Sequence, residues 1–284
     1  MLWPNQKKAA FNLGFDLDGE TIWRNKTKSL PNGSAYLKGP SVGGYGPKKG
    51  ALHILDILDE YGLKASFYAP ALVVEEHAAV VEEILRRGHE LGHHGWDHTG
   101  NYGATPEEQI ATVEKCQELF LRRTGRKAVG CRPTTAELLP ETVRWLCTDG
   151  GFTYMSMGCS RDYCGFYRIG EEETRAVNIP CRDVQMDDYV QTIYSNYPAV
   201  LPGLPRIGSY ESVYNNWIRE LEGMVRFGNS GSTAFHPQVS GTPGRSMMLR
   251  RLCEYLANSP DIWTATCEEI ADYYRKVNGG DKHE

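Results

Sequence analysis

Short apolar segments with the period of a strand alternate along the chain with segments that have the period of a helix. The clearest strand pattern runs from Phe11 to Asp18, where apolar and polar residues alternate strictly. One face of this predicted strand carries Phe11, Leu13, Phe15 and Leu17, and the other carries Asn12, Gly14, Asp16 and Asp18. Both carboxylates therefore point to the same side, toward a polar interior or cleft, while the apolar face packs against helices.

The remaining pattern predicts a regular succession of elements. Residues Thr105 to Glu108 form a capping box with Pro106 at the first helical position, which marks the start of one helix. We expect helices over residues 47–61, 75–87, 105–123, 137–149, 210–227, 244–257 and 268–275. We expect strands over residues 64–69, 89–93, 128–131, 153–157, 165–168, 184–186, 232–236 and 262–265.

Repeated alternation of strands and helices is typical of parallel strands with helices outside. The sequence has no internal repeat and no low-complexity linker, which predicts a single α/β domain over residues 1–284. The residues suited to catalysis fall at or just after the C-terminal ends of predicted strands, which is the edge that carries the active site in α/β barrels. The pattern therefore predicts one barrel-like domain.

Two segments break the pattern. Residues Trp23 to Gly46 are rich in Gly, Ser, Lys and Tyr and are too long for a plain connector. We expect them to form a loop that covers or builds a site, which favours a small substrate. Residues 189–209 are rich in Pro and Tyr and are also expected to be a loop.

Composition narrows the class of protein. The 284 residues include 31 Lys and Arg against 36 Asp and Glu, and no basic run stands out, which argues against nucleic acid and anionic membranes as partners. No stretch approaches the ~18 apolar residues of a membrane span, and residues 1–8 lack an apolar signal core. The eight Cys form no C-x-x-C pair and are expected to be free thiols. We expect a cytoplasmic protein and leave self-association into a homo-oligomer open.

A cluster of potential metal ligands is the main chemical signal. His94 and His98 are four residues apart, so on a helical turn both imidazoles reach one ion, and Asp18 supplies a carboxylate. Such a set leaves coordination positions open for water and substrate. The alternative is a chance cluster, since four of the 8 His lie between His89 and His98. His89 and His93 are interpreted as structural.

These segments, in their order along the chain, resemble the NodB-homology polysaccharide deacetylases, also called carbohydrate esterase family 4. The resemblance covers about residues 11–275, and it is closest to the branch of cytosolic-looking deacetylases and allantoinase-like hydrolases. It is carried by Phe15-Asp16-Leu17-Asp18-Gly19, His94-Gly95-Trp96-Asp97-His98, Cys131-Arg132-Pro133 and Phe235-His236-Pro237.

The resemblance implies a distorted seven-stranded (β/α) barrel and one divalent metal ion held by Asp18, His94 and His98. Zinc is the first choice of metal, with Co, Ni, Mn and Fe as alternatives. It also implies that Asp16 is the general base, Arg132 its partner and His236 the general acid. The residue types fit, because an Arg keeps a carboxylate ionised and a protonated His can protonate a leaving nitrogen.

The sequence departs from the family pattern in three places. The usual adjacent D-D is D-L-D, which places one residue between Asp16 and Asp18. Gly95 stands where Ser or Thr is usual, and Thr134-Thr135 stand where Pro and an aromatic residue are usual. The last departure puts the usual oxyanion donor and sugar-stacking geometry in doubt.

Substrate contacts are predicted at four further residues. Trp23, Tyr45 and Trp96 carry rings that can stack on a sugar or heterocycle, although each can also be a packing residue. Asp188, in Asp187-Asp188-Tyr189, resembles a substrate-loop motif of the branch, and a solvated acidic turn is the alternative.

These residues support three hypotheses about function. The first is a metal-dependent hydrolase of non-peptide C–N bonds, an N-deacetylase of N-acetylated sugars or glycans. The second is an allantoinase-like hydrolase of a small cyclic amide or imide. The third is a catalytically silent sugar-binding barrel, which does not require all of the acidic and imidazole groups. A non-haem iron oxygenase, which also uses two His and a carboxylate, is more remote.

Overall fold

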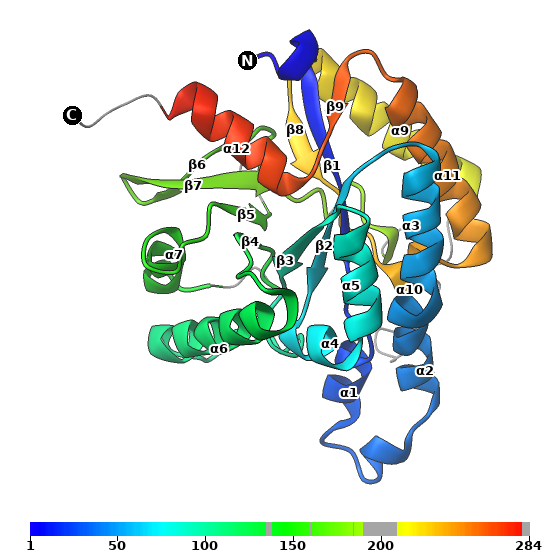
Figure 1. Ribbon diagram of the computed structural model, residues 1–284, viewed down its shortest axis with the longest axis vertical. Helices are drawn as coiled ribbons and strands as arrows, with labels where there is room; N and C mark the ends of the chain where they lie inside the picture. Colours follow the sequence, from blue (N-terminus) through cyan, green and yellow to red (C-terminus); the bar gives the residue numbers. More distant parts are fainter. Residues whose placement is uncertain (135–137, 159–160, 184, 190–208, 280–284) are drawn as a thin grey trace.

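The computed structural model describes residues 1–134, 138–158, 161–183, 185–189 and 209–279 (Figure 1). Its strands form one sheet in the order β6-β7-β5-β4-β3-β2-β1-β8, and β9 pairs with the start of β1. The pairings are parallel except between β6 and β7. The strands are β1 (Ala9–Asp16), β2 (Ala65–Ala69), β3 (Glu90–His93), β4 (Gly130–Cys131), β5 (Tyr154–Met157), β6 (Gly165–Ile169), β7 (Glu172–Pro180), β8 (Ser230–Ser232) and β9 (Ile262–Thr264).

The sheet closes on itself where the end of β7 meets β8. The Arg182 N–H donates to the carbonyl of Ser232 at 2.8 Å, and Cys181 and Ser232 form a parallel bridge. A closed ring therefore contains β1, β2, β3, β4, β5, β7 and β8, while β6 and β9 are additional strands. This arrangement confirms the predicted distorted (β/α)7 barrel.

Helices cover the outside of the ring (Figure 1). α12 closes the end opposite the strands' C-terminal edge, because its first N–H groups bond to Ser66 and Glu90 near the starts of β2 and β3. No helix in the described part of the chain is long and apolar enough to cross a bilayer. The helices are α3 (Ala51–Glu60), α4 (Ala71–Glu76), α5 (Ala78–Arg86), α6 (Pro106–Thr124), α7 (Pro140–Cys147), α9 (Tyr210–Phe227), α10 (Pro237–Ser240), α11 (Pro243–Asn258) and α12 (Cys267–Asn278).

Strand β1 is buried along its whole length. Its apolar side chains lie in the core between sheet and helices, where Phe15 stacks on Phe67 with ring centroids 5.2 Å apart. Its polar side chains point into the barrel, as the alternation predicts. The strand ends at Asp16, two residues earlier than expected, so Asp18 lies on the loop beyond it.

Three other predicted elements differ from the structure. The strand expected over residues 232–236 is displaced toward the N-terminus, since β8 runs from Ser230 to Ser232. The helix expected over residues 75–87 is divided at His77 into α4 and α5. The strand expected over residues 184–186 is wrong for 185 and 186, which lie outside any strand. The strand that the pattern missed is β7, because its first half extends beyond the ring as a hairpin with β6 and carries exposed charged residues.

The segment expected to be an irregular loop, Trp23 to Gly46, is mostly helical. It contains most of α1 (Thr21–Thr27), the short turn η2 (Gly33–Ala35) and α2 (Lys38–Tyr45), which project from the barrel as an arm (Figure 1). Trp23 is buried against Gly39 and Gly43, where a Cβ atom would lie 2.7 Å from the Trp23 ring at either position. The two helices of the arm are held together by the Trp23 ring packed on glycines. Because glycine has no apolar side chain, the sequence of the arm shows no apolar periodicity of a helix.

The arm continues into the barrel through a π-helical turn, η3 (Gly46–Gly50), that joins α2 to α3. The turn packs backbone against backbone on α10. A Cβ atom on Gly50 would lie 2.0 Å from the carbonyl oxygen of Pro237, and one on Gly241 would lie 2.3 Å from the Cα of Gly50. Only glycine fits at these two positions, because any side chain would overlap the facing backbone.

Gly43→Ala is expected to lower the free energy of unfolding by about 1–3 kcal/mol, the usual cost of overpacking. The added Cβ would lie 2.2 Å from the carbonyl oxygen of Gly19 and 2.7 Å from Trp23. The matched control is Gly223→Ala in α9, where a Cβ meets nothing within 4 Å. The control should gain up to about 1 kcal/mol from helix propensity. Equal urea midpoints for the two variants would show that the arm is not packed as described.

Candidate active site

Asp18 is a buried carboxylate surrounded by imidazole rings at distances longer than those of hydrogen bonds. Its side chain is 0% exposed, and neither of its oxygens accepts a hydrogen bond from any described residue. Its Oδ1 atom lies 3.5 Å from His94 Nε2 and 3.7 Å from His98 Nε2. These distances exceed those of good hydrogen bonds, but the three ligand atoms all lie within 4.8 Å of one another. The group can therefore surround one cation, and two imidazoles with a carboxylate form a donor set that suits zinc.

His94 is oriented by the adjacent strand. It follows β3, and its Nδ1 lies 2.6 Å from the carbonyl oxygen of Arg132. Because a carbonyl only accepts, Nδ1 carries the proton and the Nε2 lone pair faces Asp18. Burial lowers the pKa of His94 and outweighs the nearby Asp16 and Asp18 charges that raise it, which favours the neutral ligand form.

His98 is brought close to Asp18 by a backbone conformation that the sequence did not indicate. The expected helical turn is absent from residues 94–100, and the chain bends there with φ of 76° at Gly95 and 62° at His98. A left-handed conformation costs a non-glycine residue about 1–2 kcal/mol, and such strain is concentrated at functional sites. The bend is held on α4, where the N–H groups of Ala71 and Leu72 donate to Gly95 and Trp96, both at 2.9 Å.

Asp16, the last residue of β1, forms a buried ion pair with Arg132. Arg132 Nη1 donates to Asp16 Oδ1 at 2.6 Å, and the two residues are 4% and 6% exposed. Burial alone would raise the pKa of Asp16, but the charge of Arg132, with smaller effects from His94 and His236, leaves this pKa below its usual value. Asp16 is therefore an ionised carboxylate at neutral pH.

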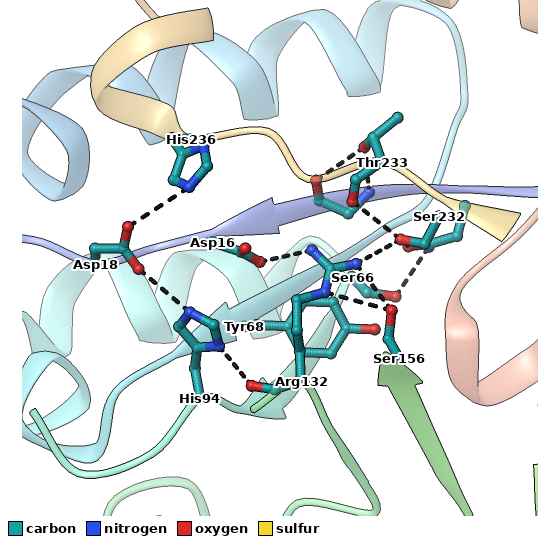
Figure 2. A network of polar contacts seen from close by, with 12 residues as sticks. Asp16, Asp18, Ser66, Tyr68, His94, Arg132, Ser156, Ser232, Thr233 and His236 are labelled. Atoms are coloured by element: carbon teal, nitrogen blue, oxygen red, sulfur yellow. Dashed lines mark hydrogen bonds and ion pairs between the residues drawn. The ribbon is translucent and has the colours of Figure 1, made fainter. Parts of the chain in front are cut away.

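His236 stands on the other side of Asp18 (Figure 2). Its Nδ1 lies 2.7 Å from Asp188 Oδ1, and its Nε2 lies 3.7 Å from Asp18 Oδ2. Burial lowers the pKa of His236, but the charge and hydrogen bond of Asp188 outweigh burial and raise it to about 10. An imidazolium therefore faces the cleft opposite the Asp16 carboxylate.

The sequence and the fold of the chain match known proteins with the same architecture. The family model described as polysaccharide deacetylase matches residues 44–155. A peptidoglycan deacetylase of Helicobacter pylori is 24% identical over 96% of this chain and 98% of its own length. The crystal structure of a putative polysaccharide deacetylase from Mycobacterium smegmatis is 27% identical, with a TM-score of 0.86 over 98% of this chain and 93% of that one.

Residues 44–155 thus match the polysaccharide deacetylase family model, and nearly the whole chain is similar in sequence and fold to proteins named as deacetylases. The predicted family and the predicted class, a hydrolase of carbon–nitrogen bonds other than peptide bonds, are thereby confirmed. The fold alone is shared with an allantoinase, whose structure has a TM-score of 0.79 and 17% identity over 97% of this chain.

The predicted aromatic substrate contacts lie away from the residues that line the cleft. Trp23 is buried in the arm with 1% exposure. Tyr45 directs its hydroxyl to the carbonyl of Gly241 at 3.3 Å, and the Trp96 ring packs against Lys115, whose Nζ is 3.4 Å from the ring centroid. All three rings are used in packing, which was the alternative considered.

Asp188 also differs from its predicted place. It is 0% exposed, so it is not a solvated turn. Its Oδ2 accepts from the His236 N–H at 2.8 Å and from the Ser240 hydroxyl at 2.6 Å. Asp188 instead orients the His236 ring and raises its pKa. The contact between Asp188 and His236 spans 48 residues, so no local sequence pattern could have indicated it.

The cleft that contains these groups has a volume of about 410 Å³. Ile22 and Lys26 of α1 form one wall, so the arm does border the site. Tyr189, which the sequence analysis did not select, also lines the cleft, and its ring is nearly perpendicular to His236 with centroids 4.4 Å apart.

Asp188→Asn is expected to lower the pKa of His236 by at least about one unit, because a contacting opposite charge raises a pKa by 1–3 units. Histidine NMR titration of chelator-treated protein measures the change. Asp183→Asn is the control, since Asp183 is an exposed residue on the cleft rim. If His236 titrates identically in wild type and both variants, Asp188 does not set its charge.

Proposed function

We propose that this chain is a metal-dependent hydrolase that removes acetyl groups from N-acetylated amino sugars. The observation that carries the proposal is the arrangement around Asp18. Two buried oxygens without hydrogen-bond partners among the described residues face His94 and His98, and Asp16 and His236 lie beside them.

In this proposal Asp18, His94 and His98 hold one divalent ion, with zinc as the first choice. Neutral imidazole nitrogens and an ionised carboxylate are the ligands that zinc and related ions bind. When bound, such an ion supplies a Lewis acid for the amide carbonyl and lowers the pKa of a coordinated water toward about 7. Glu20, Glu76 and His77 form another cluster of this kind, but Glu20 already pairs with His77 and Glu76 with Arg24.

Asp16 acts as the general base. It is ionised because Arg132 lowers its pKa, and it lines the same cleft as His94 and His98. Only its Oδ1 accepts a hydrogen bond from a described residue, so Oδ2 can take the proton of the attacking water. A positioned base of this kind contributes about 10²–10⁴-fold to the rate.

His236 acts as the general acid. Asp188 holds the Nδ1 side of the ring and keeps the imidazole protonated, so the Nε2 proton is directed into the cleft. Transfer of this proton to the leaving nitrogen lets the sugar depart as an amine. Asp16 and His236 approach the cleft from different strand ends, which allows one group to take a proton while the other gives one.

The substrate class rests on the relatives. The H. pylori protein that matches nearly end to end is named for peptidoglycan, and a protein of Schizosaccharomyces pombe with 21% identity over 95% of this chain is named a putative polysaccharide deacetylase. N-acetylated saccharides are therefore the first class to test. Replacement of the usual Pro and aromatic residue by Thr134-Thr135 favours the second candidate, a small cyclic amide or imide.

Metal content tests the proposed ligands. His98→Ala is expected to lose most of the metal that copurifies with the wild type, because one of three protein ligands is removed. Elemental analysis after purification without chelator measures it, and His77→Ala is the control from the neighbouring cluster. Equal metal in wild type and His98→Ala would remove His98 from the site.

A product assay tests the reaction. Wild type should release acetate from N-acetylglucosamine oligomers, and Asp16→Asn should keep its metal but lose at least about 10²-fold in kcat. Asp183→Asn serves as the charge-matched control. Ring-opened product from a cyclic ureide without acetate release would favour the second candidate. Metal binding without turnover of either substrate class would favour the silent sugar-binding barrel.

A further inference from the structure

The arginine of the catalytic pair is the end of a hydrogen-bond network inside the barrel (Figure 2). Arg132 Nη2 donates to Ser232 Oγ at 2.7 Å, and the Ser232 hydroxyl donates to Asn12 Oδ1 at 2.8 Å. Ser156 Oγ accepts from Arg132 Nε and Nη2 at 3.3 and 3.1 Å. The guanidinium carbon lies 4.2 Å from the centroid of the Tyr68 ring, so its plane is also covered.

The far end of the network determines which way each group points. Asn12 Nδ2 donates to Ser66 Oγ and to the carbonyl of Ala265, both at 2.9 Å. Two acceptors on the nitrogen side require that the Asn12 oxygen faces Ser232. The Ser232 hydroxyl then donates to Asn12 Oδ1 at 2.8 Å, with the Thr233 carbonyl as a longer second acceptor at 3.2 Å, and a lone pair of Ser232 is left for Arg132.

The network continues to the closed end of the barrel. Ser66 Oγ donates to Glu90 Oε2 at 2.6 Å, and the same oxygen accepts from the Glu268 N–H of α12 at 3.1 Å. Asn12 is therefore held by groups on β2, on β3 and at the start of α12, not by the catalytic residues.

Gly14 makes room for this arrangement. It lies between Asn12 and Asp16 on the inner face of β1, and a Cβ atom there would be 2.4 Å from Ser232 Oγ and 2.6 Å from Arg132 Nη2. The guanidinium thus crosses β1 at the one inner position that has no side chain.

The ion pair itself is monodentate. Arg132 reaches Asp16 through Nη1 and Oδ1 alone, whereas Arg–carboxylate pairs are frequently bidentate and then fix their own geometry. A bidentate pair would occupy Asp16 Oδ2, the oxygen that the proposed function assigns to the water proton. Something other than Asp16 must therefore hold the guanidinium in its present rotation.

We propose that Ser232 and Asn12 are positioning residues that hold Arg132 in monodentate contact with Asp16 and so keep Asp16 Oδ2 free for catalysis. Ser156 assists from the other edge of the guanidinium. The inference rests on the proposed roles of Asp16 and Arg132, and it adds Ser232 and Asn12, which are not among the residues that line the cleft.

Ser232→Ala tests the inference. The variant should lose about 10- to 100-fold in kcat, as small misplacements of catalytic groups do, with KM and metal content unchanged. Thr233→Val is the matched control. Its buried hydroxyl donates to the Gly14 carbonyl and accepts from the Gly14 N–H, both at 2.9 Å, and is not among the hydrogen-bond acceptors of Arg132, so its kcat should stay within about twofold of wild type even if its Tm falls.

A double variant separates positioning from general stability. In an Arg132→Lys background, which has no Nη2, Ser232→Ala should cause no further loss of kcat. If Ser232→Ala does not fold, Ser156→Ala is used in its place, with the same expected loss and the same absence of effect beside Arg132→Lys. Additive losses in the double variant would overturn the inference.

The outcomes distinguish this inference from the proposed function. Wild-type turnover in Asp16→Asn and Arg132→Lys would overturn both. Loss of activity in those two variants, with Ser232→Ala as active as Thr233→Val, would overturn the positioning role alone.

Discussion

A carboxylate sealed away from water, with no donor to satisfy it among the described residues, is the constraint around which this site is organised. Asp18 is 0% exposed, and its two oxygens face the Nε2 atoms of His94, His98 and His236. An uncompensated buried charge is strongly unfavourable, so the fold tolerates Asp18 only together with positive charge close by. The strained backbone of His98 and the fixed tautomer of His94 both follow from the need to direct nitrogen atoms at this carboxylate.

The second charged pair shows how the barrel interior differs from an apolar core. Arg132 and Asp16 are stable there because almost every donor of the guanidinium has an acceptor and its face has an aromatic ring. The polar face of β1 supplies much of this environment, and its apolar face supplies the core between sheet and helices. One strand with strict alternation thereby joins the catalytic chemistry to the stability of the fold.

Most of the barrel and the clustering of the main site residues could be predicted because both depend on local patterns. Helix α9 begins and ends at the predicted residues, and the capping box at Thr105 is present. Asp16 was placed by the alternation along β1, whereas Asp18 lies just beyond the end of that strand, and His94 and His98 were placed by their spacing. The four-residue spacing of His94 and His98 correctly indicated that they lie together, although the helical turn assumed for that spacing is absent.

The roles of Asp188, Ser156 and Ser232 could not be predicted from the sequence, because their contacts join residues 24 to 100 positions apart. The arm was predicted to be a loop because its Trp23 packs on glycines, which have no side chains and so give no apolar periodicity in the sequence.

The π-helical turn between α2 and α3 has a consequence for how the cleft can change. A residue in a helix advances the direction of the chain by about 100°, so a turn with one extra residue sets the phase of α2 relative to α3. Its glycines lock that phase against the segment that follows His236. Adding or removing one residue in Gly46–Gly50 would rotate α2 about the helix axis and so change its packing on Trp23 of α1, the helix whose Ile22 and Lys26 line the cleft. A change in the length of this single turn can therefore alter one wall of the cleft while the barrel and its charged residues stay in place.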